Sequence, residues 1–197
     1  MRTAAWWTFA LAWIWCIGLF VRNWFRVQAH RRQYGETWEG RLEDKPSRLG
    51  LYLQGGLFLA FIRGGPARPT WLICAAALLA IGSTIFLRHA LNHLGAQWRV
   101  NTVVTTDHKL ITTGPYSLVR HPVYTGLLGM NIATAVAIAW WPFGIISLII
   151  YWIATELRVK AEDRLLHFRF DVAHRVWCAT TPAWIPWFRQ RNSCKAA

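Results

Sequence analysis

Five apolar stretches, separated by polar segments, dominate the pattern of the chain: residues 4–21, 49–62, 71–87, 122–139 and 143–157. A helix needs about 20 apolar residues to cross roughly 30 Å of hydrocarbon, so each stretch, extended by its flanks, predicts a transmembrane helix. The second stretch is the weakest because it is short and contains Gln54. A re-entrant or interfacial segment is the alternative there. We expect an all-α integral membrane protein with about five transmembrane helices in a single membrane domain, residues 1–197.

The ends of these stretches refine the expected topology. The first stretch has the length of a signal peptide, but no A-x-A-like site follows it and it continues into the basic segment 22–32. We therefore expect a retained anchor. The last two stretches are joined only by Trp140, Trp141 and Pro142. This short connection predicts a helical hairpin, with Pro142 in the first turn of the returning helix. The absence of an internal repeat disfavours a transporter built from inverted repeats.

Composition and charge favour a membrane partner over a nucleic acid. The chain is 54% hydrophobic, contains 14 Trp and carries a formal net charge of +13. Segments 22–48, 88–120 and 158–195 hold 7, 4 and 8 of the 22 Lys and Arg residues. The positive-inside rule then places the N-terminus outside and the C-terminus in the cytoplasm. We expect a multi-pass protein whose site faces the cytoplasm and whose partners are membrane lipids, with no nucleic acid and no obligate protein partner.

The most informative segment is 108–124, which reads HKLITTGPYSLVRHPVY. Gly114 and Pro115 predict a turn, and Pro122 predicts the start of the fourth apolar helix. Arg120, His121 and Tyr124 then crowd one membrane edge. Removing these polar groups from water together is unfavourable unless something polar meets them. A snorkelling interfacial anchor is the alternative interpretation.

A second charged group follows the fifth apolar stretch, in the run ELRVKAEDRLL. If the helix continues, Arg158 and Glu162 share one face because they are four residues apart. An ordinary surface pair is the alternative. At a membrane edge, a guanidinium and a carboxylate could instead hold two differently charged ligands. For Glu156, which lies deeper, neutralisation by Lys160 or Arg158 is the default interpretation.

Metal and nucleotide motifs are weak or missing in the sequence. His89 and His93 have i,i+4 spacing, but a third ligand of obvious placement is lacking, so no metal site is expected. The four cysteines show no paired or metal-ligand spacing, and no disulfide framework is predicted. The sequence has no P-loop, no G-x-G-x-x-G after a strand and no G-x-S-x-G elbow. Any cofactor would bind to loops and helix ends.

The order GPY, RHPVY and R-x-x-x-E, with HKL upstream, resembles the isoprenylcysteine carboxyl methyltransferase family and the related phospholipid methyltransferases. The flanks NHLGAQW and TPAWIP extend the resemblance over residues 91–186. It implies a transmembrane enzyme that transfers a methyl group from S-adenosyl-L-methionine and releases S-adenosyl-L-homocysteine. Residues 101–124 and 158–186 would enclose the cofactor on the cytosolic side. A lipid-like or lipidated acceptor would enter from the bilayer.

The resemblance also implies roles for individual residues. Arg158 would hold the acceptor and serve as the catalytic, substrate-binding residue. The cofactor-binding residues would be Asn101, His108, Lys109, Leu110, Ile111, Tyr116, His121, Pro122, Val123, Tyr124 and Glu162. The tail departs from the family's F-G-x-x-Y-x-x-Y run, and Asp163 stands where the second Glu is usual. The corresponding residues here are Phe170, Asp171, His174 and Trp177.

Methyl transfer demands alignment of nucleophile, methyl group and leaving sulfur, with water excluded. A carboxylate acceptor is already ionised at neutral pH, so O-methylation needs no general base. An amine acceptor, as in phospholipid N-methylation, would need one, and His121 or Glu162 would be the candidates. Two functions of a different class also fit the sequence. One is a nicotinamide-dependent membrane reductase of related architecture, and the second is a non-catalytic scaffold whose basic face binds anionic lipid.

Overall fold

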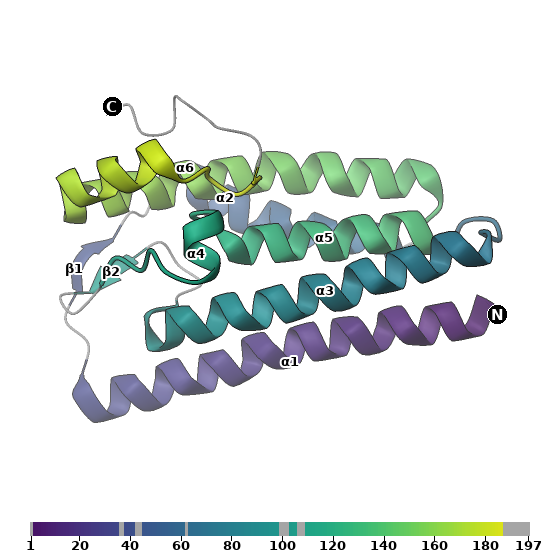
Figure 1. The fold of residues 1–197 in the computed structure, drawn as a ribbon, viewed down its shortest axis with the longest axis horizontal. Coiled ribbons are helices and arrows are strands. Elements are labelled where there is room, and N and C mark those ends of the chain that lie inside the picture. The colour runs from purple at the N-terminus through teal and green to yellow at the C-terminus, as the bar shows by residue number, and fades with distance from the viewer. Residues whose placement is uncertain are drawn as a thin grey trace.

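The protein is a bundle of long helices lying side by side (Figure 1). The structure, a computed structural model, describes residues 2–35, 38–41, 45–61, 63–98, 103–105 and 109–186. The elements are α1 (Arg2–Tyr34), β1 (Trp38–Arg41), α2 (Lys45–Gln54), the 3₁₀ helix η1 (Gly55–Phe61), α3 (Thr70–Leu94), the 3₁₀ helix η2 (Gly95–Gln97), β2 (Val103–Thr105), α4 (Pro115–Leu118), α5 (Pro122–Ala137) and α6 (Trp141–Thr180). The expected helical membrane class is confirmed, whereas the sidedness remains a prediction.

Three helical segments are long and apolar enough to cross a membrane: Trp7–Gln33, Thr70–Gln97 and Trp141–Thr180. Helix α5 is also apolar but has only 16 residues. The expected span 49–62 is divided between α2, with 10 residues, and η1, with 7. The count of five transmembrane helices is therefore not confirmed.

The break between α2 and η1 falls at Gly55 and Gly56. Glycine weakens a helix interior because it loses the most backbone freedom on folding. Gly56 also allows a close approach, because a side chain there would collide with Ile150 of α6. The segment packs along α6 as two short helices, an arrangement that apolar character alone does not predict.

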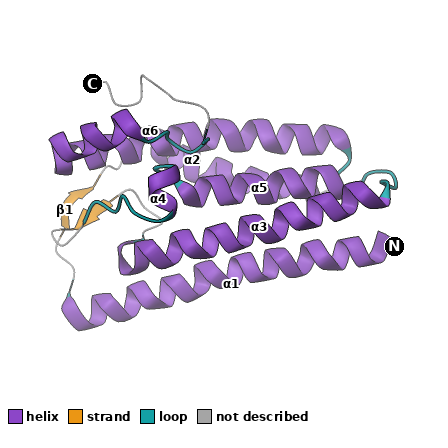
Figure 2. Ribbon diagram, viewed as in Figure 1, coloured by secondary structure: helices purple, strands orange, loops and turns teal. Residues whose placement is uncertain are grey.

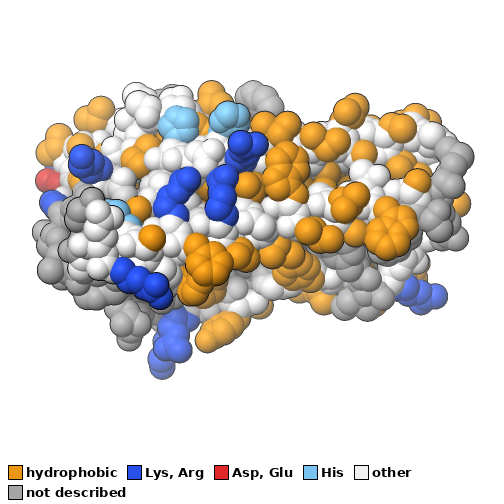
Figure 3. Space-filling model, turned by 90° about the horizontal axis from the view of Figure 1, so that it is seen from below, with side chains coloured by type: hydrophobic (Ala, Val, Ile, Leu, Met, Phe, Trp, Pro, Cys, Tyr) orange, Lys and Arg blue, Asp and Glu red, His pale blue; other side chains and the backbone are white. Residues whose placement is uncertain are grey.

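The outer surface of the bundle is apolar over much of its length. Ile14 of α1, Leu78 of α3 and Ile153 of α6 are among its exposed large side chains. Figure 3 shows hydrophobic side chains spread along one face, with Lys and Arg gathered mainly over one half of it. A surface of this kind suits contact with lipid tails, since a soluble monomer rarely exposes large contiguous apolar patches.

Polar side chains inside the bundle pair across helices. Trp13 of α1 donates a hydrogen bond from Nε1 to Thr134 Oγ1 of α5 at 2.9 Å. Ser147 Oγ of α6 donates to Asn131 Oδ1 of α5 at 2.6 Å. In hydrocarbon such groups need a protein partner because water is excluded. These contacts therefore help to fix the packing of α1 and α6 against α5.

The helical fold also contains one small antiparallel pairing, of β1 with β2, which was not expected (Figure 2). Trp38 pairs with Thr105 and Arg41 with Val103. The ladder joins the connection that precedes α2 to the one that precedes α4. These segments were expected only as polar loops, because each strand is too short to show an alternating pattern.

Helix α6 reverses direction near its end. Asp171 has φ 32° and ψ −99°, which is non-helical and separates two helical arms. Figure 1 shows the second arm, drawn in yellow, folding back along the first. The expected hairpin before α6 is confirmed, with Pro142 in the first turn. Both arms of α6 thereby reach the same end of the bundle.

Candidate functional site

The turn between α4 and α5 carries the RHPVY motif. Gly114 has φ 61° directly before α4, and a side chain there would collide with the ring of His93. Pro122 begins α5, as expected. The amides of Arg120 and His121, just before α5, donate to the carbonyls of Pro182 and Ala183 at 2.9 and 2.8 Å. Residues 181–184, which we call the closing segment, are thereby fixed against this turn.

Helix α6 brings Arg158 and Glu162 to Tyr124 of α5. The Tyr124 hydroxyl donates to Glu162 Oε1 at 2.5 Å, and Arg158 Nη2 lies 3.0 Å from the same oxygen. Arg158 Nε donates to the Tyr124 hydroxyl at 3.1 Å. The Arg158 side chain is 5% exposed and that of Glu162 is 25% exposed. The expected i,i+4 pair is therefore a largely buried three-residue network rather than a surface ion pair.

His121 links this network to a second carboxylate. Its Nδ1 lies 3.2 Å from Glu162 Oε2, and its Nε2 lies 3.0 Å from Asp163 Oδ1. Burial alone would lower the pKa of His121, but the charges of Asp163 and Glu162 and their hydrogen bonds raise it to about 9. Both carboxylates thus favour the protonated form of His121.

Asp163 is buried and has several partners. Arg120 Nη2 lies 2.8 Å from Asp163 Oδ2, and His174 Nε2 lies 3.4 Å from Oδ1. Arg120 also donates from Nη1 to the carbonyl of Thr181 at 2.6 Å. We call Arg120, His121, Tyr124, Arg158, Glu162 and Asp163 the charged cluster.

Sequence reasoning placed Arg120 at the membrane edge and noted Asp163 and His174, but included none of them among the site residues. The signal available was adjacency, because Arg120 precedes His121 and Asp163 follows Glu162. That His174 meets Asp163 depends on the reversal at Asp171, which no local pattern indicates.

The remaining expected cofactor residues divide into three groups. Asn101 and His108 lie outside the described residues. Lys109 is exposed, and its amide donates to Gln97 Oε1 at 2.6 Å. Four further residues lie in or beside the apolar packing around Trp177, next to the charged cluster: Leu110, Ile111, Tyr116 and Val123. Pro122 is buried at the start of α5, between His121 and Val123 in the chain.

Tyr116 and Glu156 have partners that were not expected. The carbonyl of Tyr116 accepts a hydrogen bond from Trp177 Nε1 at 3.2 Å. Burial, and then the charge of Glu162, raise the pKa of Tyr116 above its usual value. Glu156 accepts a hydrogen bond from Trp184 Nε1 of the closing segment at 3.0 Å. Neutralisation by Lys160 or Arg158 is therefore not the whole explanation for Glu156.

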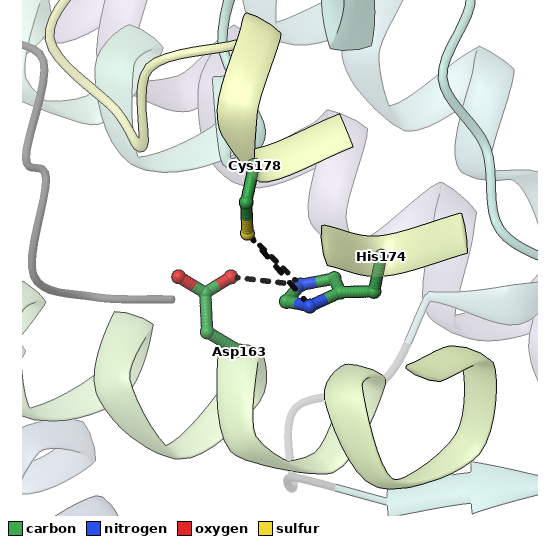
Figure 4. Close-up of side chains that lie close together, drawn as sticks. All are labelled: Asp163, His174 and Cys178. Atoms are coloured by element: carbon green, nitrogen blue, oxygen red, sulfur yellow. Dashed lines mark hydrogen bonds and ion pairs between the residues drawn. The ribbon is translucent and has the colours of Figure 1, made fainter. Parts of the chain in front are cut away.

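Asp163, His174 and Cys178 point toward one another from the two arms of α6 (Figure 4). Their potential ligand atoms lie within 4.8 Å of one another, a spacing that a metal ion could bridge. However, Asp163 is already bound by Arg120 and His121, and Cys178 is disulfide-bonded, contrary to expectation. Zinc and similar ions bind the thiolate form of cysteine. We therefore interpret these residues as a hydrogen-bonded group that holds the two arms together.

His89 and His93 do not point to a shared ligand. His93 Nδ1 lies 3.0 Å from the carbonyl oxygen of His89, and the His93 ring packs at Gly114. An i,i+4 histidine pair that binds a metal needs ring nitrogens directed outward from one face. The contacts of His93 favour a structural role.

Apolar helices long enough to cross a membrane, with a buried charged cluster where α5 begins, define a helical membrane protein with a polar site. Residues 75–168 match the model of the isoprenylcysteine carboxyl methyltransferase family, which confirms the predicted resemblance for this segment. The family is one of methyltransferases. The match includes Asp163 but ends before Asp171 and the closing segment. No curated protein matches the chain significantly.

Proposed function

We propose that the protein transfers a methyl group from S-adenosyl-L-methionine to the carboxylate of a lipid-like or prenylcysteine-like acceptor at the membrane. The observation that carries this proposal is the meeting of His121, Tyr124, Arg158 and Glu162 in one network. These residues lie within residues 75–168, which match the family model, and the sequence resemblance implies cofactor and acceptor roles for them. A passive membrane anchor would not need them to share hydrogen bonds.

The donor set fits a cationic cofactor. When bound, S-adenosyl-L-methionine supplies a methyl group on a positively charged sulfur. Glu162 offers a carboxylate that is partly exposed and that already accepts from a cation, Arg158. A cationic group that binds Glu162 would replace Arg158 there. The residues proposed to line this side are Asn101, His108, Lys109, Leu110, Ile111, Tyr116, His121, Pro122, Val123 and Tyr124.

In this proposal the acceptor binds to the guanidinium of Arg158, which becomes available when the cofactor replaces it at Glu162. Arg158 matches a carboxylate in a two-pronged geometry and can fix its angle without protonating it. Among the described residues, the charged cluster brings the cations Arg120, His121 and Arg158 beside the carboxylates of Glu162 and Asp163. An anionic acceptor is attracted by the Arg158 guanidinium, whereas a protonated amine would be repelled by it.

The ligand test separates the enzyme classes. Protein purified in detergent should unfold at a higher temperature with S-adenosyl-L-homocysteine, because a ligand that binds only the native state stabilises it. Stabilisation by NADPH alone would support a reductase, and by neither ligand a scaffold. Transfer of a labelled methyl group into a total lipid extract, followed by product identification, then distinguishes an ester from a methylated amine.

Two substitutions separate the roles of the ion pair. Glu162→Ala should mainly weaken binding of S-adenosyl-L-homocysteine, whereas Arg158→Ala should retain that binding and lose turnover of an acidic acceptor. Arg175→Ala is the matched control, because it removes the same charge from an exposed position on the same helix. If both cluster variants bind ligand and turn over like the control, the site assignment is wrong.

A further inference from the structure

The ring of His121 lies between two carboxylates. Asp163 Oδ1 is 3.0 Å from Nε2, and Glu162 Oε2 is 3.2 Å from Nδ1. A neutral imidazole has one donor nitrogen and one acceptor nitrogen, whereas an ionised carboxylate only accepts. A neutral ring would therefore leave one nitrogen lone pair facing an anionic oxygen. Only the doubly protonated ring satisfies both contacts.

Asp163 cannot turn away from His121, because its remaining contacts hold it in place. Arg120 Nη2 binds its second oxygen at 2.8 Å, and both side chains are 1% exposed. His174, from the second arm of α6, lies 3.4 Å from the oxygen that faces His121. The carboxylate is thus fixed by residues from both the α4–α5 turn and the returning arm.

This arrangement determines which hydrogen bonds each oxygen of Glu162 accepts. His121 donates to its Oε2, which leaves Oε1 for Tyr124 and Arg158. Tyr124 of α5 also lies over the His121 ring, with a centroid separation of 6.0 Å. Among the described residues, the charged and titratable groups around His121 are Asp163 and Glu162 from α6, Tyr124 from α5, the neighbouring Arg120, and His174 on the far side of Asp163.

We propose that Asp163 is a positioning residue that keeps His121 protonated and directed at Glu162, so that His121 acts as a fixed cation and not as a base. The raised pKa of His121, about 9, agrees with this geometry. The proposal concerns the chain's own side chains, and it rests on the proposed function only in treating Glu162 as the cofactor contact. An imidazolium has no lone pair with which to take a proton from an amine acceptor.

The first test uses the wild-type protein without ligand. Histidine-labelled protein in detergent should show both His121 ring nitrogens protonated at about pH 7.5, where an ordinary histidine is mostly neutral. Loss of the signal in His121→Gln assigns it. A single-proton neutral ring at this pH would overturn the proposal. This measurement requires no catalysis, so its result is separate from the success or failure of the proposed function.

The second test compares two matched Asp→Asn variants of α6. Asp163→Asn should let His121 lose its proton between about pH 6 and pH 8. Its affinity for S-adenosyl-L-homocysteine should then vary with pH over that range, by about tenfold for each pKa unit by which the bound ligand shifts the pKa of His121. Asp171→Asn makes the same change at an exposed side chain and should leave the His121 signal and the pH profile as in wild type.

The outcomes distinguish the positioning role of Asp163 from the proposed function. If Asp163→Asn behaves like Asp171→Asn in both measurements, Asp163 does not position His121 and the proposal fails. If no form binds S-adenosyl-L-homocysteine while the His121 signal shifts in Asp163→Asn, the proposed function fails and the positioning role stands. Should Asp163→Asn not fold, the wild-type measurement alone decides.

Discussion

At the scale of single residues, the hydroxyl of Tyr124 connects the two charges proposed to bind different ligands. It donates to Glu162 at 2.5 Å and accepts from Arg158 at 3.1 Å. A phenol is suited to this position because it both donates and accepts, whereas neither charged neighbour can do both. Tyr124 thus holds Glu162 and Arg158 in register when no ligand is bound.

Tyr124→Phe should lower kcat/KM by about tenfold, because a hydrogen bond to a charged group contributes on the order of 1.5–3 kcal/mol. The phenyl ring retains the packing over His121, but the largely buried Arg158–Glu162 pair loses two hydrogen bonds, so the unfolding temperature should also fall by a few degrees. Methyl-transfer kinetics with a labelled cofactor measure the effect. Tyr52→Phe removes the same hydroxyl from an exposed side chain of α2 and should be silent. Equal kinetics for the two variants would contradict the role of Tyr124.

At the scale of elements, the site depends on how closely α2 packs against α6. Gly50 of α2 is buried, and a Cβ there would lie 2.8 Å from the carbonyl oxygen of Ala154 and 3.0 Å from Arg158 Cγ. The helix that was weakest as a membrane span therefore supports the stem of Arg158. Gly50 allows this close packing because glycine has no side chain, and a hydropathy pattern does not reveal such a contact.

Gly50→Ala should reduce the free energy of unfolding by about 1–3 kcal/mol, the usual effect of overpacking. It should also raise the KM for the acceptor, because Arg158 must shift. Thermal unfolding in detergent and acceptor titrations measure these effects. Gly82→Ala in α3 is the control, since a Cβ there meets nothing within 4 Å. A Gly50→Ala protein as stable and active as the control would show that the contact is unimportant.

The sequence predicted features that depend on residues close together in the chain and missed features that depend on distant contacts. Helix starts at Pro122 and near Pro142, the Gly114 turn and the Arg158–Glu162 face follow from spacing within one or two turns. The contact of His174 with Asp163 could not be predicted, because these two residues meet only after α6 reverses. The division of 49–62 was likewise hidden, since hydropathy measures apolar character and not helix continuity.

At the scale of the whole molecule, burying several charges in one cluster makes stability depend on pH. Burial lowers the pKa of His121, but the charges of Asp163 and Glu162 and their hydrogen bonds together outweigh this effect and raise the pKa from 6.5 to about 9 in the folded state. The folded state therefore binds this proton more tightly than the unfolded state does. The resulting stability is fully present below pH 6.5 and is lost as the pH rises toward 9.

The unfolding temperature of the wild-type protein in detergent should accordingly fall by several degrees as the pH is raised from about 6.5 to 9.5. His121→Gln lacks the titrating ring and should show a shallower decline from a lower starting value. Scanning both proteins over the same buffers makes the comparison. Parallel declines would mean that different groups determine the pH dependence.

The closing segment has a consequence for how the protein is made. Arg120 and His121 obtain their backbone hydrogen-bond partners from Pro182 and Ala183, which are translated after every long helix. A chain still emerging from the ribosome can insert its helices, yet it leaves these amides without their partners at the edge of the bilayer. The site is thus complete only once the residues after α6 have been made, and a chain that stops at α6 should lack the proposed methyl transfer.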